Sequence, residues 1–495
     1  MRQPRANAAE GALALVVALA DELEREKISY CHWKSNAAID RSESGDNDLD
    51  LLIARRDAQA FFAAAARQGF VSARPPRSRD VPSVHDLYAV DPVSHKVVHL
   101  HAHLQMVVGD DMTKNYRLPI EDAYLQSVGF ERLLPLPAVD FEYVVFVLRM
   151  TIKYAPLDSR LSRRHRLSEA ETAELAFLRA RMTADTVAHI VSTHLPEVGV
   201  ALFAQCERVI DRPGAVRSRA RAAWRLQRAL SAHARRPALA DTALKLARRA
   251  HWIGFGRKRK GRYKKRPVSG GLMIAVVGGD GSGKSTLVRG LSESLRAKFV
   301  VSTIHLGKPS KGLVTRSARQ ILGLGRRVGL FRNVYAGSHE TAAQPTRFPG
   351  YAWLGWNTAV ARDRRRAYRR ARRAVARGDL VLCDRFPLAE LRSADGSRTA
   401  PLAIDNWPRR ARVLARYERR LYAGIRPAEL AFVLRVDPRT AVSRRPEQDE
   451  QFVQRRNAEI WVRDWDSSPS FVVLDASAPA ASVLRQALDV IWRTL

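Results

Sequence analysis

The sequence predicts an α/β protein whose C-terminal part is a doubly wound parallel sheet, preceded by an α+β N-terminal domain and a helical middle region. Two patterns support this prediction. Helical periodicity dominates residues 141–250, and beyond them short apolar runs alternate with helical segments, as in a mainly parallel sheet. The later strand-like runs span residues 273–277, 380–383, 430–436 and 471–474. Near the N-terminus, an amphipathic first helix precedes β-like runs at 49–53 and 96–104.

A chain of 495 residues has room for about three domain-sized units. The stretch GFGRKRKGRYKKRP, which ends at Pro267, is the best candidate linker because it is rich in glycine and positive charge. We therefore expect an N-terminal domain at 1–120, a helical region at 121–255, a basic linker at 256–270 and a C-terminal domain at 271–495.

A complete P-loop motif, GxxxxGK[ST], begins at Gly278 and lies between a predicted strand and a predicted helix. This context matters because the N–H groups of the turn and of the helix N-terminus must converge on phosphate oxygens. The motif predicts an ATP site in which Lys284 neutralises the β- and γ-phosphates and the Ser285 hydroxyl ligates Mg²⁺. The residues expected to bind ATP here are Gly278, Gly281, Ser282, Gly283, Lys284, Ser285 and Thr286.

Asp384 and Arg385 follow a short apolar strand, at the end of the strand where open α/β sheets bind ligands. An aspartate in this position can hold Mg²⁺ or align an acceptor, and the adjacent arginine can bind a phosphate through two hydrogen bonds. On the preceding helix, Arg364 falls in the same inward-facing stripe as Tyr368 and Ala371. A buried arginine needs an anion, which is either a substrate phosphate or a structural carboxylate.

These residues occur in an order that resembles the thymidylate kinase family over residues 271–495. The resemblance includes Asp280 inside the P-loop, the Asp384-Arg385-Phe386 run and the later run from Arg444 to Glu447. It implies in-line phosphoryl transfer from ATP with Mg²⁺ as cofactor, in which Lys284, Asp384, Arg385 and Arg445 are catalytic. It further implies that Asp280, Arg364 and Arg385 bind the acceptor, that Ser285 and Asp384 hold Mg²⁺, and that Arg444 packs on the adenine.

The phosphoryl acceptor stays open. Val276-Val277-Gly278 and the segment 305–309 stand where family members usually carry Phe-Glu-Gly and Arg-Glu-Pro. A nucleoside monophosphate such as dTMP is the first expectation. Fusions of this kind are associated with bacterial surface polysaccharide pathways, so a phosphorylated sugar or lipid-linked acceptor is the alternative. A third interpretation is a P-loop ATPase that switches contacts with nucleic acid or membrane.

The N-terminal segment from about 25 to 118 resembles the nucleotidyltransferase superfamily, in which a small-residue turn precedes a strand with two aspartates. Asp48 and Asp50 lie at i and i+2 and therefore face the same side of a strand. The resemblance implies that they bind a divalent metal and that Ser35 or Lys34 touches a triphosphate. The strand that usually brings a third aspartate instead carries three histidines at 99, 101 and 103. His101 and its neighbours either complete the metal site or bind phosphate, and the domain is either catalytic or purely binding.

The formal net charge of +34 makes anionic partners the expectation, although part of the excess can be a solvated surface. A phosphorylated small acceptor is the main candidate. An anionic membrane surface and a homodimer remain open, and nucleic acid is disfavoured because no DNA-binding motif is present. Cys31, Cys206 and Cys383 lie far apart without metal-ligand spacing, which suits a reducing compartment. We expect a cytoplasmic protein.

Overall fold

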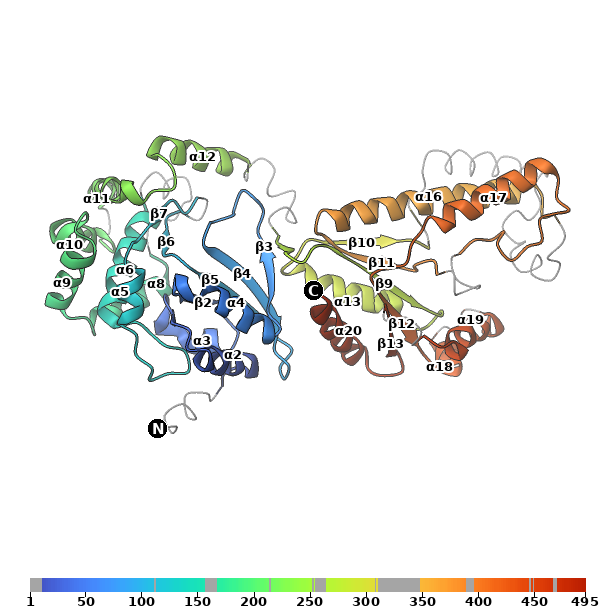
Figure 1. Cartoon of the computed structure of the whole chain (residues 1–495), viewed down its shortest axis with the longest axis horizontal. Helices are drawn as coiled ribbons and strands as arrows, with labels where there is room; N and C mark the ends of the chain where they lie inside the picture. Colours follow the sequence, from blue (N-terminus) through green and yellow to red (C-terminus); the bar gives the residue numbers. More distant parts are fainter. Residues whose placement is uncertain are drawn as a thin grey trace. The chain divides into compact units, whose positions relative to one another are not determined.

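The chain folds into two compact units, Met1–Lys265 and Arg266–Leu495, drawn in Figure 1. The boundary between the two units, after Lys265, falls inside the segment expected to be a linker, 256–270. Residues 256–263 of that segment lie outside the residues that the structure describes. The helical region expected at 121–255 shares a unit with the N-terminal sheet. The computed structural model describes residues 11–110, 113–155, 167–212, 215–251, 253, 264–307, 309, 348–388, 396–444, 447, 449–465 and 470–495.

The first unit contains a mixed sheet in the order β1-β2-β5-β4-β3. β2 and β5 are parallel, and β4 runs antiparallel to both of its neighbours, β5 and β3. In this register Asp50 of β2 and Asp86 of β4 lie opposite the same residue of β5, His101. The strands of the first unit are β1 (Tyr30–His32), β2 (Leu49–Ile53), β3 (Val71–Arg74), β4 (Val84–Val90), β5 (Val97–His103), β6 (Val107–Val108) and β7 (Tyr116–Arg117).

Side-chain alternation gives the two faces of this sheet different roles. Leu49, Leu51 and Leu100 point to one face, where they form a core with the apolar sides of α2 and α4. The intervening residues, among them Asp50 and His101, therefore point to the other face. The helices on this side of the unit build a second core, which Trp33 and Leu52 also join.

The first unit contains the predicted first helix and a helix-rich stretch after residue 139, together with three helices that were not predicted, α3, α4 and α5. Its amphipathic first helix is α2, which buries Val16, Leu19 and Leu23. The helices are α2 (Ala14–Arg25), α3 (Ile39–Glu43), α4 (Ala58–Arg67), α5 (Glu121–Gln126), α6 (Val139–Lys153), α8 (Glu169–Arg179), α9 (Ala184–His194), α10 (Gly199–Val209), α11 (Val216–Ala229) and α12 (Ala238–His251), with short 3₁₀ turns at Asn36–Ala38, Arg55–Asp57 and Leu230–His233.

The second unit is built on a parallel five-stranded sheet in the order β10-β11-β9-β12-β13. This confirms the predicted mixed α/β class with a parallel sheet. The four predicted strands of this part are observed within two residues of their expected bounds, and β10 was not predicted. The strands are β8 (Arg266–Pro267), β9 (Leu272–Gly278), β10 (Val301–His305), β11 (Leu380–Asp384), β12 (Leu430–Arg435) and β13 (Phe471–Asp475).

Helices cover both faces of this sheet. α16 and α19 contribute Ala371 and Ile460 to the core that also contains Met273 and Val381. The alternate residues Ile274 and Leu382 point to the opposite face, where α13 packs beside α20. The helices of the second unit are α13 (Lys284–Arg296), α16 (Tyr351–Ala376), α17 (Arg409–Ala423), α18 (Pro438–Ser443), α19 (Glu450–Val462) and α20 (Ala480–Thr494).

Among the helices that the structure describes, none combines the length and apolar character needed to cross a membrane.

The stability of the second unit's sheet depends on apolar side chains of its central strands that are completely buried. Leu382 of β11 has no exposed surface, whereas Val413 of α17 is 62% exposed. We expect Leu382→Ala to lower the unfolding free energy of this unit by about 2–5 kcal/mol, because the truncation leaves a cavity. Hydrogen exchange on peptides from β9 and β11 in increasing urea would measure the change. Val413→Ala is the control, and equal effects of the two substitutions would contradict the assigned packing.

Candidate functional site

The P-loop connects the end of β9 at Gly278 to the start of α13 at Lys284. Gly281 and Gly283 adopt positive φ angles of 81° and 84°, which side-chain-bearing residues rarely tolerate. The Ser282 hydroxyl donates a hydrogen bond to the carbonyl of Gly279, 2.8 Å away, and this bond closes the turn. The loop therefore gathers N–H groups at the N-terminus of α13, where the helix dipole favours an anion.

Lys284 is the first residue of α13, and its ammonium lies over the loop. Its Nζ donates to the carbonyl of Gly278 at 3.0 Å and to that of Gly279. The side chain is 7% exposed, so the positive charge is held beside the loop rather than in bulk solvent.

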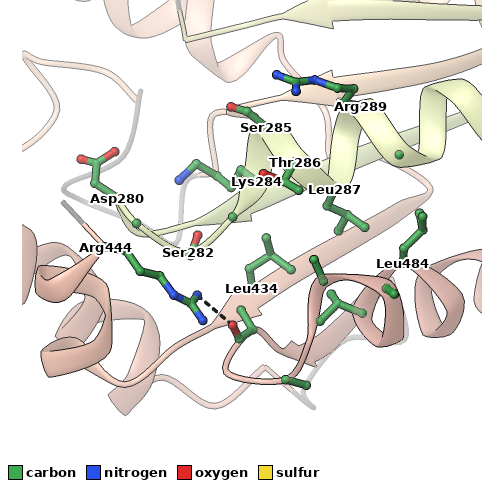
Figure 2. A pocket seen from close by; sticks show the side chains of 18 of the residues that line it. Asp280, Ser282, Lys284, Ser285, Thr286, Leu287, Arg289, Leu434, Arg444 and Leu484 are labelled. Atoms are coloured by element: carbon green, nitrogen blue, oxygen red, sulfur yellow. Dashed lines mark hydrogen bonds between the residues drawn. The ribbon is translucent and has the colours of Figure 1, made fainter.

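A cavity of about 600 Å³ opens at this end of α13, a volume in the range of small-molecule sites. Figure 2 shows the P-loop side chains on one side of it and Arg444 on the other. The Arg444 Nη1 donates to the carbonyl of Ala476 at 2.9 Å, which fixes the guanidinium at the cavity wall. The lining includes every predicted ATP-binding residue except Gly278, together with Asp280 and Arg385.

Asp384 and Arg385 lie at the carboxyl end of β11, next to β9. The parallel register pairs Asp384 with Val276, two residues before the P-loop begins. Arg385 has a positive φ of 55°, an uncommon conformation for a residue with a side chain and one that occurs often at functional sites. Its Nη2 donates to Asp280 Oδ1 at 3.1 Å, so two predicted acceptor-binding residues form an ion pair at the cavity.

The Asp384 carboxylate fits the predicted role of a cation ligand. Its Oδ1 is buried and makes no hydrogen bond to any described residue, and its Oδ2 is 3.8 Å from His305 Nε2. A buried carboxylate oxygen without a partner is costly, and a bound cation would offset that cost. Ser285 lines the neighbouring cavity and Asp384 does not, so their shared Mg²⁺ site stays a prediction.

Arg364 is buried on α16, as the helical stripe predicted. Its Nε and Nη2 donate to the carbonyls of Leu306 and Gly307, at 2.6 and 2.9 Å, and its Nη1 contacts the hydroxyl of Tyr422. The guanidinium thus holds the chain that follows β10, and Arg364 is not part of the cavity lining. The sequence predicted that Arg364 contacts a substrate phosphate or a structural carboxylate. These contacts are instead to two backbone carbonyls and a tyrosine hydroxyl.

Sequence reasoning missed Asn457, a buried residue of α19. Its Nδ2 donates to the carbonyl of Asp280 at 3.0 Å, and a Cβ added at Gly279 would lie 2.0 Å from its Oδ1. α19 therefore braces the P-loop from outside. The one local signal in the sequence was Gly279, because only glycine lets the Asn457 side chain pack this closely against the loop backbone.

The predicted catalytic Arg445 lies outside the described residues, so its role stays a prediction.

A second group of polar side chains lies on the first unit's sheet. His101 Nδ1 is 3.2 Å from Asp50 Oδ1, and its Nε2 is 2.8 Å from Asp86 Oδ1. His99 bridges Asp48 and Asp86 at 2.8 and 3.0 Å. Asp86 of β4 adds a third carboxylate beside these histidines, one that the sequence did not predict. The sequence missed Asp86 because the pairing of β4 with β5 is not visible in a local pattern.

Two lysines neutralise these buried carboxylates. Lys34 Nζ is 2.8 Å from Asp50 Oδ1, and Lys265 Nζ is 2.7 Å from Asp86 Oδ1. Burial alone would raise the pKa of Asp50, but Lys34 and the imidazoles of His101 and His103 hold it well below its usual range. Burial lowers the pKa of His103 to about 4. Asp50 is therefore ionised and His103 neutral near pH 7.

The turn expected to touch a triphosphate is occupied by carboxylates of the same unit. The backbone N–H of Ser35 donates to Glu174 Oε1 at 3.1 Å, and that of Asn36 donates to Glu142 Oε1 at 3.2 Å. Since Lys34 is paired with Asp50, the phosphate-contacting groups predicted for this domain are already engaged within the chain.

Glu142 gives this turn a testable pH dependence. Burial is the main cause that raises its pKa from 4.5 to about 7, and the nearby Glu174 adds to it. Between these values the folded chain binds more protons than the unfolded chain, so stability falls as pH rises. The loss amounts to about 3 kcal/mol by pH 8. We expect Glu142→Gln, which keeps an acceptor for Asn36, to flatten this slope in urea unfolding of the first unit between pH 4.5 and 8.

The matched control for that substitution is Glu131→Gln, at an exposed position. An unfolding free energy whose pH slope is the same in Glu142→Gln and in the unmodified chain would contradict the assignment.

Comparison with known proteins places the chain among relatives described as ATP-binding. No family model matches it. Over 225 residues it is 33% identical to the uncharacterized ATP-binding protein YghR of Escherichia coli K12, an alignment that covers 43% of this chain and 84% of YghR. It is 29% identical over 230 residues to the uncharacterized ATP-binding protein YghS of the same organism, covering 45% of this chain and 93% of YghS. On this identity and coverage, the chain belongs to the family of ATP-binding proteins that includes YghR.

Proposed function

We propose that the second unit is an ATP-dependent kinase that transfers the γ-phosphoryl group to a small phosphorylated acceptor, with a nucleoside monophosphate such as dTMP as the first candidate. The observation that carries this proposal is the Asp384-Arg385 pair beside the P-loop, in which Arg385 contacts Asp280 and one oxygen of Asp384 has no partner among the described residues. An ATP site that served binding alone would not need this second polar group.

ATP binding itself is supported by three features. The glycine turn and α13 present backbone N–H groups, Lys284 supplies a positive charge, and the names of YghR and YghS describe ATP binding. Arg444 lies at the cavity wall, where its planar guanidinium is suited to stack on a base. Ser285 and Asp384 would hold Mg²⁺, which supplies charge neutralisation for the phosphates when bound.

Transfer requires an acceptor held in line with the phosphates. Arg385 is 31% exposed at its side chain and is paired with Asp280, so the pair presents one cation and one hydrogen-bond acceptor to the cavity. These are the groups needed to bind the phosphate and a hydroxyl of a phosphorylated nucleoside or sugar. Because phosphoryl transfer is mostly positioning and charge stabilisation, Lys284 and Arg385 carry most of the chemistry that protein residues must supply.

A phosphorylated sugar or lipid-linked acceptor satisfies the same two groups and is kept as the alternative acceptor class. The ATPase-switch interpretation predicts no phosphorylated product. The nucleotidyltransferase-like role of the first unit stays a prediction. Its three carboxylates, Asp48, Asp50 and Asp86, support it, and the engagement of Ser35 with Glu174 opposes it.

The proposal is tested by incubating the full chain with ATP and Mg²⁺ against a panel of nucleoside monophosphates and sugar phosphates, with products identified by mass. We expect one acceptor class to gain a phosphoryl group. Lys284→Ala should lower this rate by about 10²–10³-fold, the loss typical of removing one preorganised electrostatic group. Lys298→Ala, just beyond the other end of α13, is the control. Hydrolysis of ATP without any phosphorylated acceptor, stimulated by nucleic acid or anionic vesicles, would favour the switch instead.

The contact between α19 and the P-loop gives a separate prediction. In Gly279→Ala the new methyl group would lie 2.0 Å from Asn457 Oδ1, so the loop must shift. We expect ATP to bind at least about tenfold more weakly, as measured by displacement of a fluorescent ATP analogue. Gly355→Ala is the control, because a Cβ added there meets no atom within 4 Å.

If the clash is the cause, Asn457→Ala combined with Gly279→Ala should restore part of the lost affinity. Strictly additive losses in the double variant would show that α19 does not brace the loop.

A further inference from the structure

The His and Asp side chains on the first unit's sheet are arranged as a candidate metal site. Strand pairing aligns Asp50, His101 and Asp86 across three neighbouring strands, β2, β5 and β4. His103 follows His101 by two residues and therefore points to the same face. The arrangement is set by backbone register, so the donor atoms do not depend on a loop.

The separations between donor atoms match those around a single ion. Donors about 2.1 Å from an ion lie about 3.0 Å apart in octahedral and about 3.4 Å apart in tetrahedral coordination. Asp50 Oδ1 is 3.2 Å from His101 Nδ1 and 3.5 Å from His103 Nε2. The donor atoms of these three residues all lie within 4.8 Å of one another. Asp48 Oδ2 lies 4.0 Å from His101 Nδ1, and Asp48 forms a second group of donors with His99 and His101.

His103 is an independent indication of a missing ligand. The side chain is buried, with 8% exposure, and neither ring nitrogen makes a hydrogen bond to any residue that the structure describes. A buried imidazole whose ring nitrogens make no hydrogen bond is costly. Its Nε2 faces Asp50, so an ion between the two side chains would satisfy both.

Asp86 then acts as a positioning residue. It accepts a hydrogen bond from His101 Nε2 at 2.8 Å, which leaves Nδ1, on the Asp50 side, as the nitrogen with a free lone pair. Histidine ligands of metals commonly donate their other N–H to a carboxylate in this way, and the contact fixes the ring and its tautomer.

We propose that Asp50, His101 and His103 bind a transition-metal ion of the Zn²⁺ or Mn²⁺ class, with Asp86 orienting His101. Mixed imidazole and carboxylate donors suit these ions, whereas Mg²⁺ prefers an all-oxygen set. This makes specific one of the two alternatives from the sequence, in which the histidines of β5 complete a metal site with the aspartates of β2. The site lies within the first unit and is independent of the kinase proposal.

The neighbouring lysine provides a diagnostic variant. Lys34 Nζ is 2.8 Å from Asp50 Oδ1, so an incoming cation must compete with the ammonium for that oxygen. Lys34→Gln should therefore bind the metal more tightly. A cluster that serves only as a network of ion pairs would show no such gain.

The test is titration of the metal-stripped full chain, without nucleotide, with Zn²⁺, Mn²⁺ and Mg²⁺ separately by calorimetry, with bound metal counted by mass spectrometry. We expect one tight Zn²⁺ or Mn²⁺ site and weaker Mg²⁺ binding. His101→Gln and His103→Gln should each lower the affinity by at least about tenfold, and Asp86→Asn by about 10–100-fold. Lys34→Gln should raise it.

His85→Gln is the matched control, since His85 neighbours Asp86 on β4 but is exposed and points to the other face. Circular dichroism establishes that each variant is folded, and Co²⁺ absorption supplies a second readout of nitrogen ligation in the unmodified chain. The proposal is overturned if Mg²⁺ binds as tightly as Zn²⁺ and Mn²⁺. It is also overturned if His101→Gln binds like His85→Gln while Lys34→Gln shows no gain.

Discussion

The parallel pairing of β9 with β11 is the constraint on which the second unit's site depends. Because the strands run in the same direction, the P-loop that follows β9 and the Asp384-Arg385 pair that ends β11 emerge at the same edge of the sheet. A shift of one residue in this register would turn Asp384 to the other face. The contact between Arg385 and Asp280 is therefore a consequence of sheet geometry, and it joins the expected ATP site to the expected acceptor site.

Both units bury charged side chains, which is costly without partners, and each unit offsets this cost differently. The second unit places Lys284 against loop carbonyls and buries Arg364 against carbonyls of the chain after β10. The first unit concentrates three aspartates on one sheet face and balances them with two lysines and three imidazoles. A partly satisfied network of this kind is costly, and neither ring nitrogen of His103 makes a hydrogen bond to a described residue, although its Nε2 lies 3.5 Å from Asp50. A metal ion would complete the network.

Local signals predicted the P-loop, the strands of the second sheet and the buried position of Arg364. Each depends on a motif or a periodicity within about 20 residues. The sequence did not predict Asn457 or Asp86, because each acts through a contact with a distant segment: Asn457 with Asp280, and Asp86 with His101. Helical or strand periodicity cannot show which strands become neighbours. The same reason explains why the engagement of Ser35 with Glu174 was missed, since 139 residues separate them.

The central claim is that ATP bound at the P-loop gives its γ-phosphoryl group to an acceptor rather than to water. The most direct measurement follows isotope-labelled γ-phosphate during a single turnover, with enzyme in excess over ATP and with acceptor saturating. The account predicts that most of the label appears in an organic phosphate ester or anhydride. Label found only in inorganic phosphate, across nucleotide and sugar phosphate acceptors, would contradict it.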